Sequence, residues 1–439
     1  MKIWKILKTL TFVVAMFFLI IGKVSAQPIT PVSGCYLGAY LGCGINDFCC
    51  STPKNFNDST GKKHAFFTRY IESNSWANLT DAALWNWAES LKDTGINATP
   101  VLFVKPGCSF DSISNSLLDS NYSEFAQKCV DYNCPILFAF GYEMNGWWAP
   151  YCDTSGIKYI AAYQHVYNII HSVAPNVQFC WVPLQVWGQK PYDRFYPGDI
   201  YVDWVGLNVY DRDYDCINLC TSGMFTSSID ADSFYTVYSA NKNKPMLIGE
   251  TALFDANLDP YISTPLTYQQ QADEKNDWIN QVYDTATLLS NYPNINLICY
   301  FHTRKVESFT SICIPTPVDI TADWRIPLDT ANDLYRSLIS NSYFLTKELD
   351  SCIFASINEN NINADDFLHV YPNPASEKIT IETQEKSIIE ILNIQGQLVK
   401  SIKSNDSKTN IDVSALQSGM YLVEVKTENG VVVRKFVKE

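Results

Sequence analysis

Residues 136–143 read ILFAFGYE, an apolar run of strand length that passes through a glycine and ends in Glu143. Residues 245–251, PMLIGET, repeat this arrangement and place Glu250 directly after their apolar run. A carboxylate in this position is costly to bury even partly unless it is paired or used. The two stretches therefore predict buried strands that each carry a functional glutamate at the carboxyl end.

Short β-rich runs of this kind recur through the middle of the chain, and helical patterns such as residues 81–91, 157–170 and 268–289 lie between them. The runs are residues 35–41, 64–70, 99–104, 135–140, 177–182, 202–210, 245–250 and 295–301. Eight strands with crossover helices predict a (β/α)8 TIM barrel over residues 32–347. An open doubly wound sheet is the structural alternative, but no Gly-rich phosphate loop supports it.

Composition narrows the class of ligand. The chain has 439 residues and a net charge of −14, and most of its acidic surplus falls in the predicted barrel. Such a charge argues against nucleic-acid binding, which relies on clustered Lys and Arg. The aromatic share of 14% favours flat, uncharged ligands, because aromatic faces bind them.

The two ends of the chain differ from its middle. Residues 1–26 combine a basic start, an apolar run and a small-x-small site at Val24-Ser25-Ala26, which is typical of a secretory signal peptide. An uncleaved membrane anchor is the alternative. Residues 348–366 are polar and lack apolar periodicity, so they are interpreted as a linker. Residues 367–439 contain neither Cys nor Trp and are interpreted as a separate domain.

Cysteine usage agrees with export, because the 14 cysteines are an even number and a secreted chain meets an oxidising compartment. Most of them are predicted to form structural disulfides that pin loops. The pairs that lie close in sequence are Cys35 and Cys43, Cys129 and Cys134, and Cys216 and Cys220. A metal site is the rival interpretation, but histidine is scarce and no Cys-x-x-Cys pair occurs, so neither a metal nor a cofactor is expected.

The two glutamates suggest a reaction. In a barrel of this type the chemistry takes place at the carboxyl ends of the strands. Glu143 and Glu250, on the fourth and seventh strands, would face each other about 5 Å apart, which suits retaining glycoside hydrolysis. One carboxyl then protonates the leaving oxygen while the other attacks the sugar carbon. The alternative is that each glutamate bonds to a neighbouring helix N-terminus.

Four segments resemble glycoside hydrolase family 26, the β-mannanase family of retaining barrel enzymes. Residues 142–148, YEMNGWW, resemble its acid/base motif, and residues 203–210, DWVGLNVY, its sixth-strand segment. Residues 248–251, IGET, are similar to its nucleophile strand, and residues 323–325, DWR, to the segment after the eighth strand. The resemblance spans about residues 34–345. It implies a barrel that acts on a β-linked plant or algal polysaccharide.

The resemblance also implies roles for residues. Glu143 becomes the general acid/base and Glu250 the nucleophile, with Tyr210 as the hydrogen-bond donor to Glu250. The residues expected to contact substrate, or to shape the site around it, are Tyr142, Asn145, Trp147, Trp148, Trp187, Tyr210 and His302. The tryptophans are expected to stack on sugar rings, although barrel packing is the alternative for at least one of them. Asn145 either fixes the acid loop or touches substrate.

This sequence departs from the family pattern at three places. Mannanases of the family usually have His before the acid/base and Arg three residues earlier, where this chain has Tyr142 and Ala139. Phe301-His302 replaces the Trp expected near the end of the eighth strand. β-Mannan remains the favoured substrate. A mixed-linkage β-glucan, a β-1,3-xylan, or binding of glycan without catalysis are the alternatives.

The C-terminal domain begins with Val370-Tyr371-Pro372-Asn373-Pro374 and continues in alternating strands separated by Gly turns. This pattern predicts a small β-sandwich. Together with the KFVK ending at residues 435–438, it resembles the type IX secretion sorting domain. The resemblance implies export by that machinery and removal of the domain, with the enzyme released or attached to the cell surface. A carbohydrate-binding module is the alternative, and the exported protein is expected to be a monomer.

Overall fold

The computed structural model describes residues 29–31, 33–42, 51–71, 77–146, 155–185, 192–211, 222–253, 267–309, 318–326, 334–347, 368–383, 387–393, 398–404, 406–417, 419–427 and 430–438. The chain divides into two compact units, Met1–Phe354 and Ala355–Glu439, which are taken one at a time below. The predicted signal peptide, residues 1–26, and the predicted linker, residues 348–366, lie outside the described residues. None of the helices within these ranges is long and apolar enough to cross a membrane.

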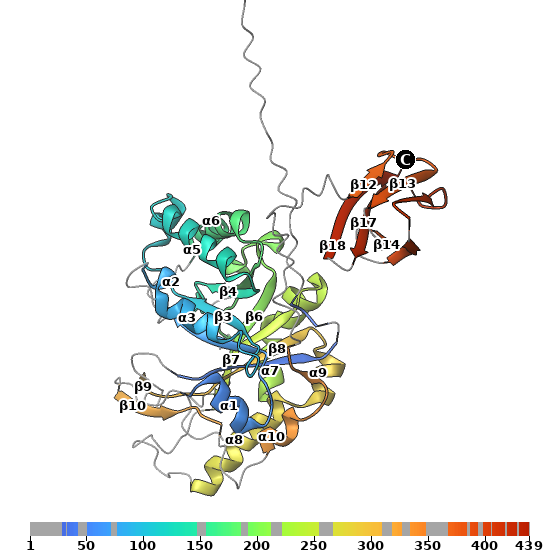
Figure 1. Cartoon of the computed structure of the whole chain (residues 1–439). Coiled ribbons are helices and arrows are strands. Elements are labelled where there is room, and N and C mark those ends of the chain that lie inside the picture. Colours follow the sequence, from blue (N-terminus) through green and yellow to red (C-terminus); the bar gives the residue numbers. More distant parts are fainter. Residues whose placement is uncertain are drawn as a thin grey trace, which may run out of the picture. The chain divides into compact units, whose positions relative to one another are not determined.

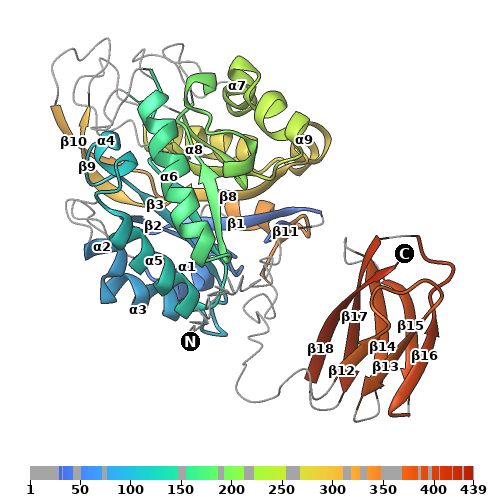
Figure 2. The same cartoon turned by 90° about the horizontal axis from the view of Figure 1, so that it is seen from above.

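The first unit is a closed barrel of parallel strands, as Figures 1 and 2 show. Neighbouring strands pair in chain order, and pairing of the last strand with the first closes the ring. The strands are β1 (Cys35–Tyr40), β2 (Phe66–Ile71), β3 (Thr99–Val104), β4 (Ile136–Phe140), β5 (Val177–Trp181), β6 (Trp204–Asp211), β7 (Met246–Leu253) and β8 (Ile295–Phe301). This arrangement confirms the predicted (β/α)8 fold.

Helices surround the barrel (Figure 2). The α-helices are α1 (Pro53–Thr60), α2 (Ala77–Thr80), α3 (Ala82–Ser90), α4 (Phe110–Ser114), α5 (Asp119–Tyr132), α6 (Ile157–Val173), α7 (Met224–Asp230), α8 (Tyr268–Val282), α9 (Thr285–Asn291) and α10 (Leu334–Ile339). Short helical turns of other types are η1 (Tyr192–Phe195), η2 (Asp199–Tyr201), η3 (Ala231–Ser233), η4 (Tyr235–Ser239) and η5 (Ala240–Lys242). The helix expected over residues 268–289 is two helices, because Asp284 caps a new N-terminus by accepting from the N–H of Ala286.

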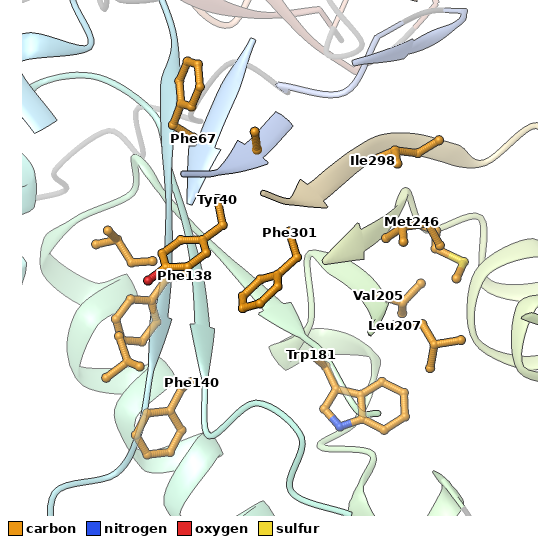
Figure 3. Packing of buried hydrophobic residues seen from close by; sticks show 14 of the residues in the cluster. Tyr40, Phe67, Phe138, Phe140, Trp181, Val205, Leu207, Met246, Ile298 and Phe301 are labelled. Carbon is orange, nitrogen blue, oxygen red and sulfur yellow. The ribbon is translucent and has the colours of Figure 1, made fainter. Parts of the chain in front are cut away.

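Alternation along each strand builds two apolar layers. In β4, Leu137 and Ala139 face the barrel interior, whereas Phe138 and Phe140 pack in the layer between barrel and helices. Figure 3 shows the second layer, with Trp181 of β5 among its members. Fully burying a large apolar side chain contributes about 1.5–3 kcal/mol to folding, so these layers fix the strand ends that carry the site.

Two of the predicted local disulfides are not formed. Cys35 and Cys129 are free, buried thiols, so neither bonds to its sequence neighbour, Cys43 or Cys134. The physical reason is packing, because both side chains are fully buried in the layer between barrel and helices, where a thiol behaves as a small apolar group. The pair Cys216 and Cys220 lies outside the described residues.

Short strands complete the first unit. β9 (Arg304–Phe309) and β10 (Val318–Asp323) form an antiparallel pair after the last barrel strand, and β11 (Phe344–Leu345) adds to β1 in parallel. The antiparallel pair brings the chain back from Arg304 to Asp323, which are partners at its open end. This return places residues 323–326 beside the end of β8.

The second unit is an antiparallel β-sandwich. One sheet has the order β12-β13-β16 and the other the order β15-β14-β17-β18. The strands are β12 (Leu368–Tyr371), β13 (Lys378–Thr383), β14 (Ser387–Asn393), β15 (Leu398–Ser404), β16 (Lys408–Asp412), β17 (Gly419–Thr427) and β18 (Gly430–Lys438). Alternating apolar residues from both sheets, including Ile379, Ile391 and Val423, form its own core. The predicted all-β sandwich is confirmed.

Candidate active site

Glu143 lies on a turn at the carboxyl end of β4. The turn begins at Gly141, with φ of 60°, and Glu143 itself has φ of 54°, a conformation that costs a non-glycine residue energy. The backbone N–H of Glu143 donates to the carbonyl of Val182 at 2.8 Å. The N–H of Gly146 donates to the backbone carbonyl of Glu143, also at 2.8 Å. These two bonds hold the acid at the rim of the barrel while its side chain stays half-buried.

Asn145 fixes the same turn from its other side. Its side-chain amide donates to the carbonyl of Leu184 at 2.8 Å and accepts from the N–H of Leu184 at 2.9 Å. The side chain is buried and both of its polar groups are used. Of the two roles that the sequence left open for Asn145, this pairing supports the structural one.

Glu250 lies within β7, at a bulge. The register of β7 shifts by one residue against β6 at Gly249, and against β8 between Ile248 and Thr251. Such a bulge re-aims the side chains that follow it. Glu250 is 6% exposed and accepts a hydrogen bond from the Tyr210 hydroxyl. The hydrogen bond expected between Tyr210 and Glu250 is therefore present.

The surroundings of Glu250 favour its protonated form, although hydrogen bonds oppose this. Burial raises the pKa of Glu250 from 4.5 to about 7, and the negative charge of Glu143 adds to the rise. The hydroxyls of Tyr210 and Tyr70 and the charge of Lys305 lower this pKa, but by less. The effect of the Glu143 charge on the pKa of Glu250 also means that the two carboxyls lie near each other.

Asn208 links the two halves of the site. Its side-chain amide donates to Oε1 of Glu143 at 2.9 Å. Its backbone N–H donates to the carbonyl of Pro183 at 3.0 Å, which fixes the strand on which it stands. A Cβ atom on Gly249 would lie 2.6 Å from Oδ1 of Asn208. Glycine before Glu250 therefore leaves room for the amide that binds Glu143.

Gln185 fixes the end of β6 next to Tyr210. Its side-chain carbonyl accepts from the N–H of Tyr210 at 2.7 Å, and its amide donates to the carbonyl of Tyr210 at 2.8 Å. Gln185 is 3% exposed, so these two bonds form away from water. They fix the backbone from which the Tyr210 hydroxyl reaches Glu250.

Aromatic rings surround the carboxyl pair. Tyr142 packs edge-on against Phe103 at 5.1 Å between ring centroids and lies 5.6 Å from Tyr70. On the other side Tyr40 stacks on Phe301 at 5.0 Å, and Figure 3 shows these two rings together. The rings supply apolar walls, and their faces suit the C–H surfaces of sugars.

His302 holds the segment that follows β10. Its Nδ1 accepts from the N–H of Ile326 at 3.0 Å, so the neutral ring carries its proton on Nε2. Burial, with the positive charges of Arg325 and Lys275, lowers the pKa of His302 to about 3. Asp323 binds Arg325 through both guanidinium and backbone contacts. His302 is thus a neutral residue of the rim throughout the physiological range.

Three predicted substrate residues, Trp147, Trp148 and Trp187, lie outside the described residues, so their role stays a prediction. Within the described ranges no group of three His, Cys, Asp or Glu could hold a metal ion. The sequence reasoning missed Asn208, Gln185 and Tyr70. Period-2 alternation gave a signal for Asn208, because it shares a strand face with Tyr210 two residues later.

Comparison with known proteins identifies both units. Residues 76–292 match the model of glycosyl hydrolase family 26. Residues 369–439 match the secretion system C-terminal sorting domain. The second match marks the protein for export to the cell surface or beyond it. It also excludes the alternative of a carbohydrate-binding module at this end of the chain.

The individual proteins that resemble this chain have low sequence identity to it. Endoglucanase H of Acetivibrio thermocellus is 25% identical over 306 residues, which are 65% of this chain and 30% of that protein. A β-1,3-xylanase of a Vibrio species is 23% identical over 148 residues, 32% of this chain and 28% of that protein. The matched segments thus span less than a third of each curated relative. A solved Cellulomonas fimi endo-β-1,4-mannanase double mutant is 14% identical with a TM-score of 0.48, covering 92% of this chain and 94% of that one.

Proposed function

We propose, from the premise that the barrel belongs to glycoside hydrolase family 26, that it is a retaining endo-β-glycanase with Glu143 as acid/base and Glu250 as nucleophile. One observation carries the assignment. The two carboxyls lie at the ends of β4 and β7, close enough for the charge of Glu143 to raise the pKa of Glu250. Two neighbouring carboxyls, one to give a proton and one to attack the sugar, are what a double displacement requires.

In the first step the Glu250 carboxylate attacks the anomeric carbon, and the glycosidic C–O bond breaks. Glu143 gives its proton to the leaving oxygen, so the shortened chain departs as a neutral alcohol. Asn208 donates to Oε1 of Glu143. The transferred proton is therefore assigned to Oε2, because an oxygen that accepts from the amide N–H is the poorer site for a proton.

In the second step the Glu143 carboxylate takes a proton from water as the water oxygen attacks the anomeric carbon. The bond between that carbon and Glu250 breaks, and the electron pair returns to the carboxylate. Two inversions leave the configuration of the sugar unchanged. The Tyr210 hydroxyl, which donates to Glu250, stabilises the charge that reappears there.

The substrate is proposed as a neutral β-linked polysaccharide, with β-mannan first. The aromatic rings around the carboxyl pair and the acidic charge of the chain suit a neutral glycan. Tyr142 and Ala139, where mannanases of the family carry His and Arg, motivate the alternatives of mixed-linkage β-glucan and β-1,3-xylan. The names of the curated relatives, an endoglucanase and a β-1,3-xylanase, fit the same alternatives.

Release of reducing ends from β-mannan, mixed-linkage β-glucan and β-1,3-xylan tests the proposal. The exported enzyme should cleave one of them within the chain and give a product of retained β configuration by NMR. A product of inverted configuration would refute the double displacement. Binding without cleavage of any of the three would favour the rival function, a glycan-binding barrel that has lost catalysis.

Export completes the proposal. The sandwich unit is proposed to deliver the barrel to the type IX secretion machinery and then to be removed. Mass spectrometry of the protein recovered outside the cell should find the barrel without residues 367–439. Recovery of the intact chain outside the cell would refute removal but not export.

A further inference from the structure

The hydroxyl of Tyr70 is buried at the carboxyl end of β2 and makes no hydrogen bond. A buried hydroxyl without a partner costs about 1–3 kcal/mol, so such groups are rare and call for an explanation. The sequence around Tyr70, FFTRYI, gave no functional signal. The position of its hydroxyl near Glu250, the proposed nucleophile, suggests a function for it.

Neighbouring rings fix the direction of the Tyr70 side chain. Its ring packs edge-on against Tyr40 at 4.6 Å, and lies 5.3 Å from Phe103 and 5.6 Å from Tyr142 between centroids. Rings packed on several sides leave only the hydroxyl hydrogen free to rotate. Tyr70 and Tyr210 pack edge-on against the same ring, Phe301, at 6.1 and 5.9 Å between centroids, and Tyr210 donates to Glu250. The Tyr70 hydroxyl is thus near enough to Glu250 to lower its pKa, although it does not reach normal hydrogen-bond geometry.

Tyr70 stays protonated and can only be a neutral hydroxyl there. Burial raises the pKa of Tyr70 well above its usual value, and the charges of Glu250, Tyr210 and Tyr142 add to the rise. A phenol in this state donates a hydrogen bond to a carboxylate far better than it gives up its proton. Its one available carboxylate neighbour among these groups is Glu250.

Glu250 lacks the donors that an ionised carboxylate needs in an apolar site. The groups that act on it are the Glu143 carboxyl, the hydroxyls of Tyr210 and Tyr70, and the Lys305 ammonium; the Cys299 thiol feels its charge in turn. Among the described residues, the Tyr210 hydroxyl donates a hydrogen bond to it. A carboxylate with two or three donors can stay ionised even when buried.

We propose that Tyr70 is a second catalytic phenol, whose hydroxyl already acts weakly on Glu250 in the free enzyme and completes a hydrogen bond to it when a sugar fills the site. The inference deepens the proposed function and rests on Glu250 as the nucleophile. A bound sugar excludes water from Glu250, so the donor gains strength as the dielectric around it falls. The unpaired hydroxyl of the free enzyme is then a group held ready for the bound state.

The hydrogen bonds from Tyr70 and Tyr210 to Glu250 change in strength during the reaction. When Glu250 forms its bond to the anomeric carbon its charge disappears and both hydrogen bonds weaken. When water attacks that carbon the bond to Glu250 breaks, the electron pair returns to the carboxylate, and both phenols stabilise it. Loss of Tyr70 should therefore slow the second step and let the glycosyl-enzyme accumulate.

Tyr70→Phe removes the hydroxyl and keeps the ring. The matched control is Tyr163→Phe in α6, which removes another fully buried hydroxyl without a hydrogen-bond partner, on a ring that packs against Tyr159 and Phe179. Difference infrared titration of the full chain, with Glu250→Gln to assign the band, gives the pKa of Glu250 directly. The expected result is an upward shift of about one unit in Tyr70→Phe, and no shift in Tyr163→Phe.

Activity provides the second measurement, on whichever of the three glycans the wild type cleaves. kcat for Tyr70→Phe should fall about 10- to 100-fold, with the glycosyl-enzyme detected by mass spectrometry. An unchanged Glu250 titration in Tyr70→Phe overturns the proposal. If the wild type cleaves nothing but the titration still shifts, the contact stands and the proposed function fails.

Discussion

The ends of β4 and β7 present the same residue type in opposite ways. β4 stops at Phe140, and positive φ angles at Gly141 and Glu143 lift the acid onto a half-exposed turn. β7 runs on through its bulge, and Glu250 stays within the strand at 6% exposure. Similar sequences, an apolar run followed by glutamate, thus give one half-exposed carboxyl on a turn and one buried carboxyl within a strand.

The difference teaches what each carboxyl must do. An acid/base exchanges protons with the leaving group and then with water, so it must be accessible. A nucleophile forms and breaks a bond at a fixed point, so a strand that allows little movement suits it. Placement on a turn or in a strand is therefore a functional distinction that the residue type alone does not express.

The largest expected effect separates the two carboxyls by their leaving-group dependence. Glu250→Ala should lower kcat at least about 10⁴-fold on every substrate, because no other described group replaces the attacking oxygen. Glu143→Ala should be as damaging to the rate on polysaccharide, yet keep most of the kcat/KM on a dinitrophenyl β-glycoside. That leaving group needs no proton, and kcat/KM reports only the first step, before Glu143 acts as base. Initial rates on both substrates provide the measurement. Recovery in Glu250→Ala rather than Glu143→Ala would reverse the assignment.

Removal of the phenol that holds the nucleophile should come next in size. Tyr210→Phe loses the hydrogen bond to Glu250 and should lower kcat about 100-fold on either kind of substrate. Tyr283→Phe is the matched control, since its buried hydroxyl has no partner and lies among the outer rings. Steady-state measurement of kcat for the two variants tests this prediction. Equal losses in the two variants would mean that only packing has been measured.

The pH dependence of stability should distinguish the two environments. The pKa of Glu250 is raised from 4.5 to about 7, so the folded chain binds that proton more tightly than the unfolded chain. Stability from this group is therefore present below about pH 4.5 and is lost as the pH rises through about 7, to the extent of roughly 3 kcal/mol. Glu250→Gln should be more stable than wild type at pH 8 and equal to it at pH 4.

Thermal unfolding at the two pH values measures this difference. Glu143→Gln should gain less at pH 8, because it removes the repulsion between the carboxyls but leaves the burial of Glu250 in place. A greater gain in Glu143→Gln than in Glu250→Gln would show that repulsion, rather than burial, dominates the pair.

Much of the fold could be read from the sequence, because parallel strands buried on both faces leave long apolar runs. All eight runs correspond to barrel strands, and the glutamates after two of them lie at its rim. The role of Tyr210 as hydrogen-bond donor to Glu250 could also be predicted, and alternation in β6 places Tyr210 on the same face as Asn208. These inferences depend on local periodicity, which a single sequence contains.

The remaining features depend on distant contacts. The positive φ of Glu143 is held by the Val182 carbonyl from the next strand, and nothing in residues 136–143 encodes that bond. The direction of the Tyr70 hydroxyl is fixed by rings from β1, from β3 and from the turn after β4. The pKa of Glu250 reflects burial that the sequence could not weigh against hydrogen bonding. The prediction of disulfides at Cys35 and Cys129 was wrong for the same reason, because closeness in sequence does not indicate how a cysteine side chain is packed.

The smallest expected effect concerns the amide that holds the acid. Asn208→Ala removes the 2.9 Å hydrogen bond to Oε1 of Glu143 and should lower kcat on polysaccharide about 10-fold. The same variant should keep nearly its full kcat/KM on the dinitrophenyl glycoside, because Asn208 acts only through Glu143 and this parameter excludes the step in which Glu143 is the base. Gly249→Ala should resemble it, since the new Cβ would displace the Asn208 amide.

Asn176→Ala is the control for this positioning role. Asn176 is also a buried amide, bound to the carbonyls of Cys129 and Cys134, but it stands just before β5, at the opposite end of the barrel. It should lower Tm while leaving the ratio of rates on the two substrates unchanged. If Asn208→Ala loses equal rate on both substrates, the amide supports the barrel rather than Glu143. The different positioning of the two carboxyls would then need another explanation than the hydrogen bond from Asn208.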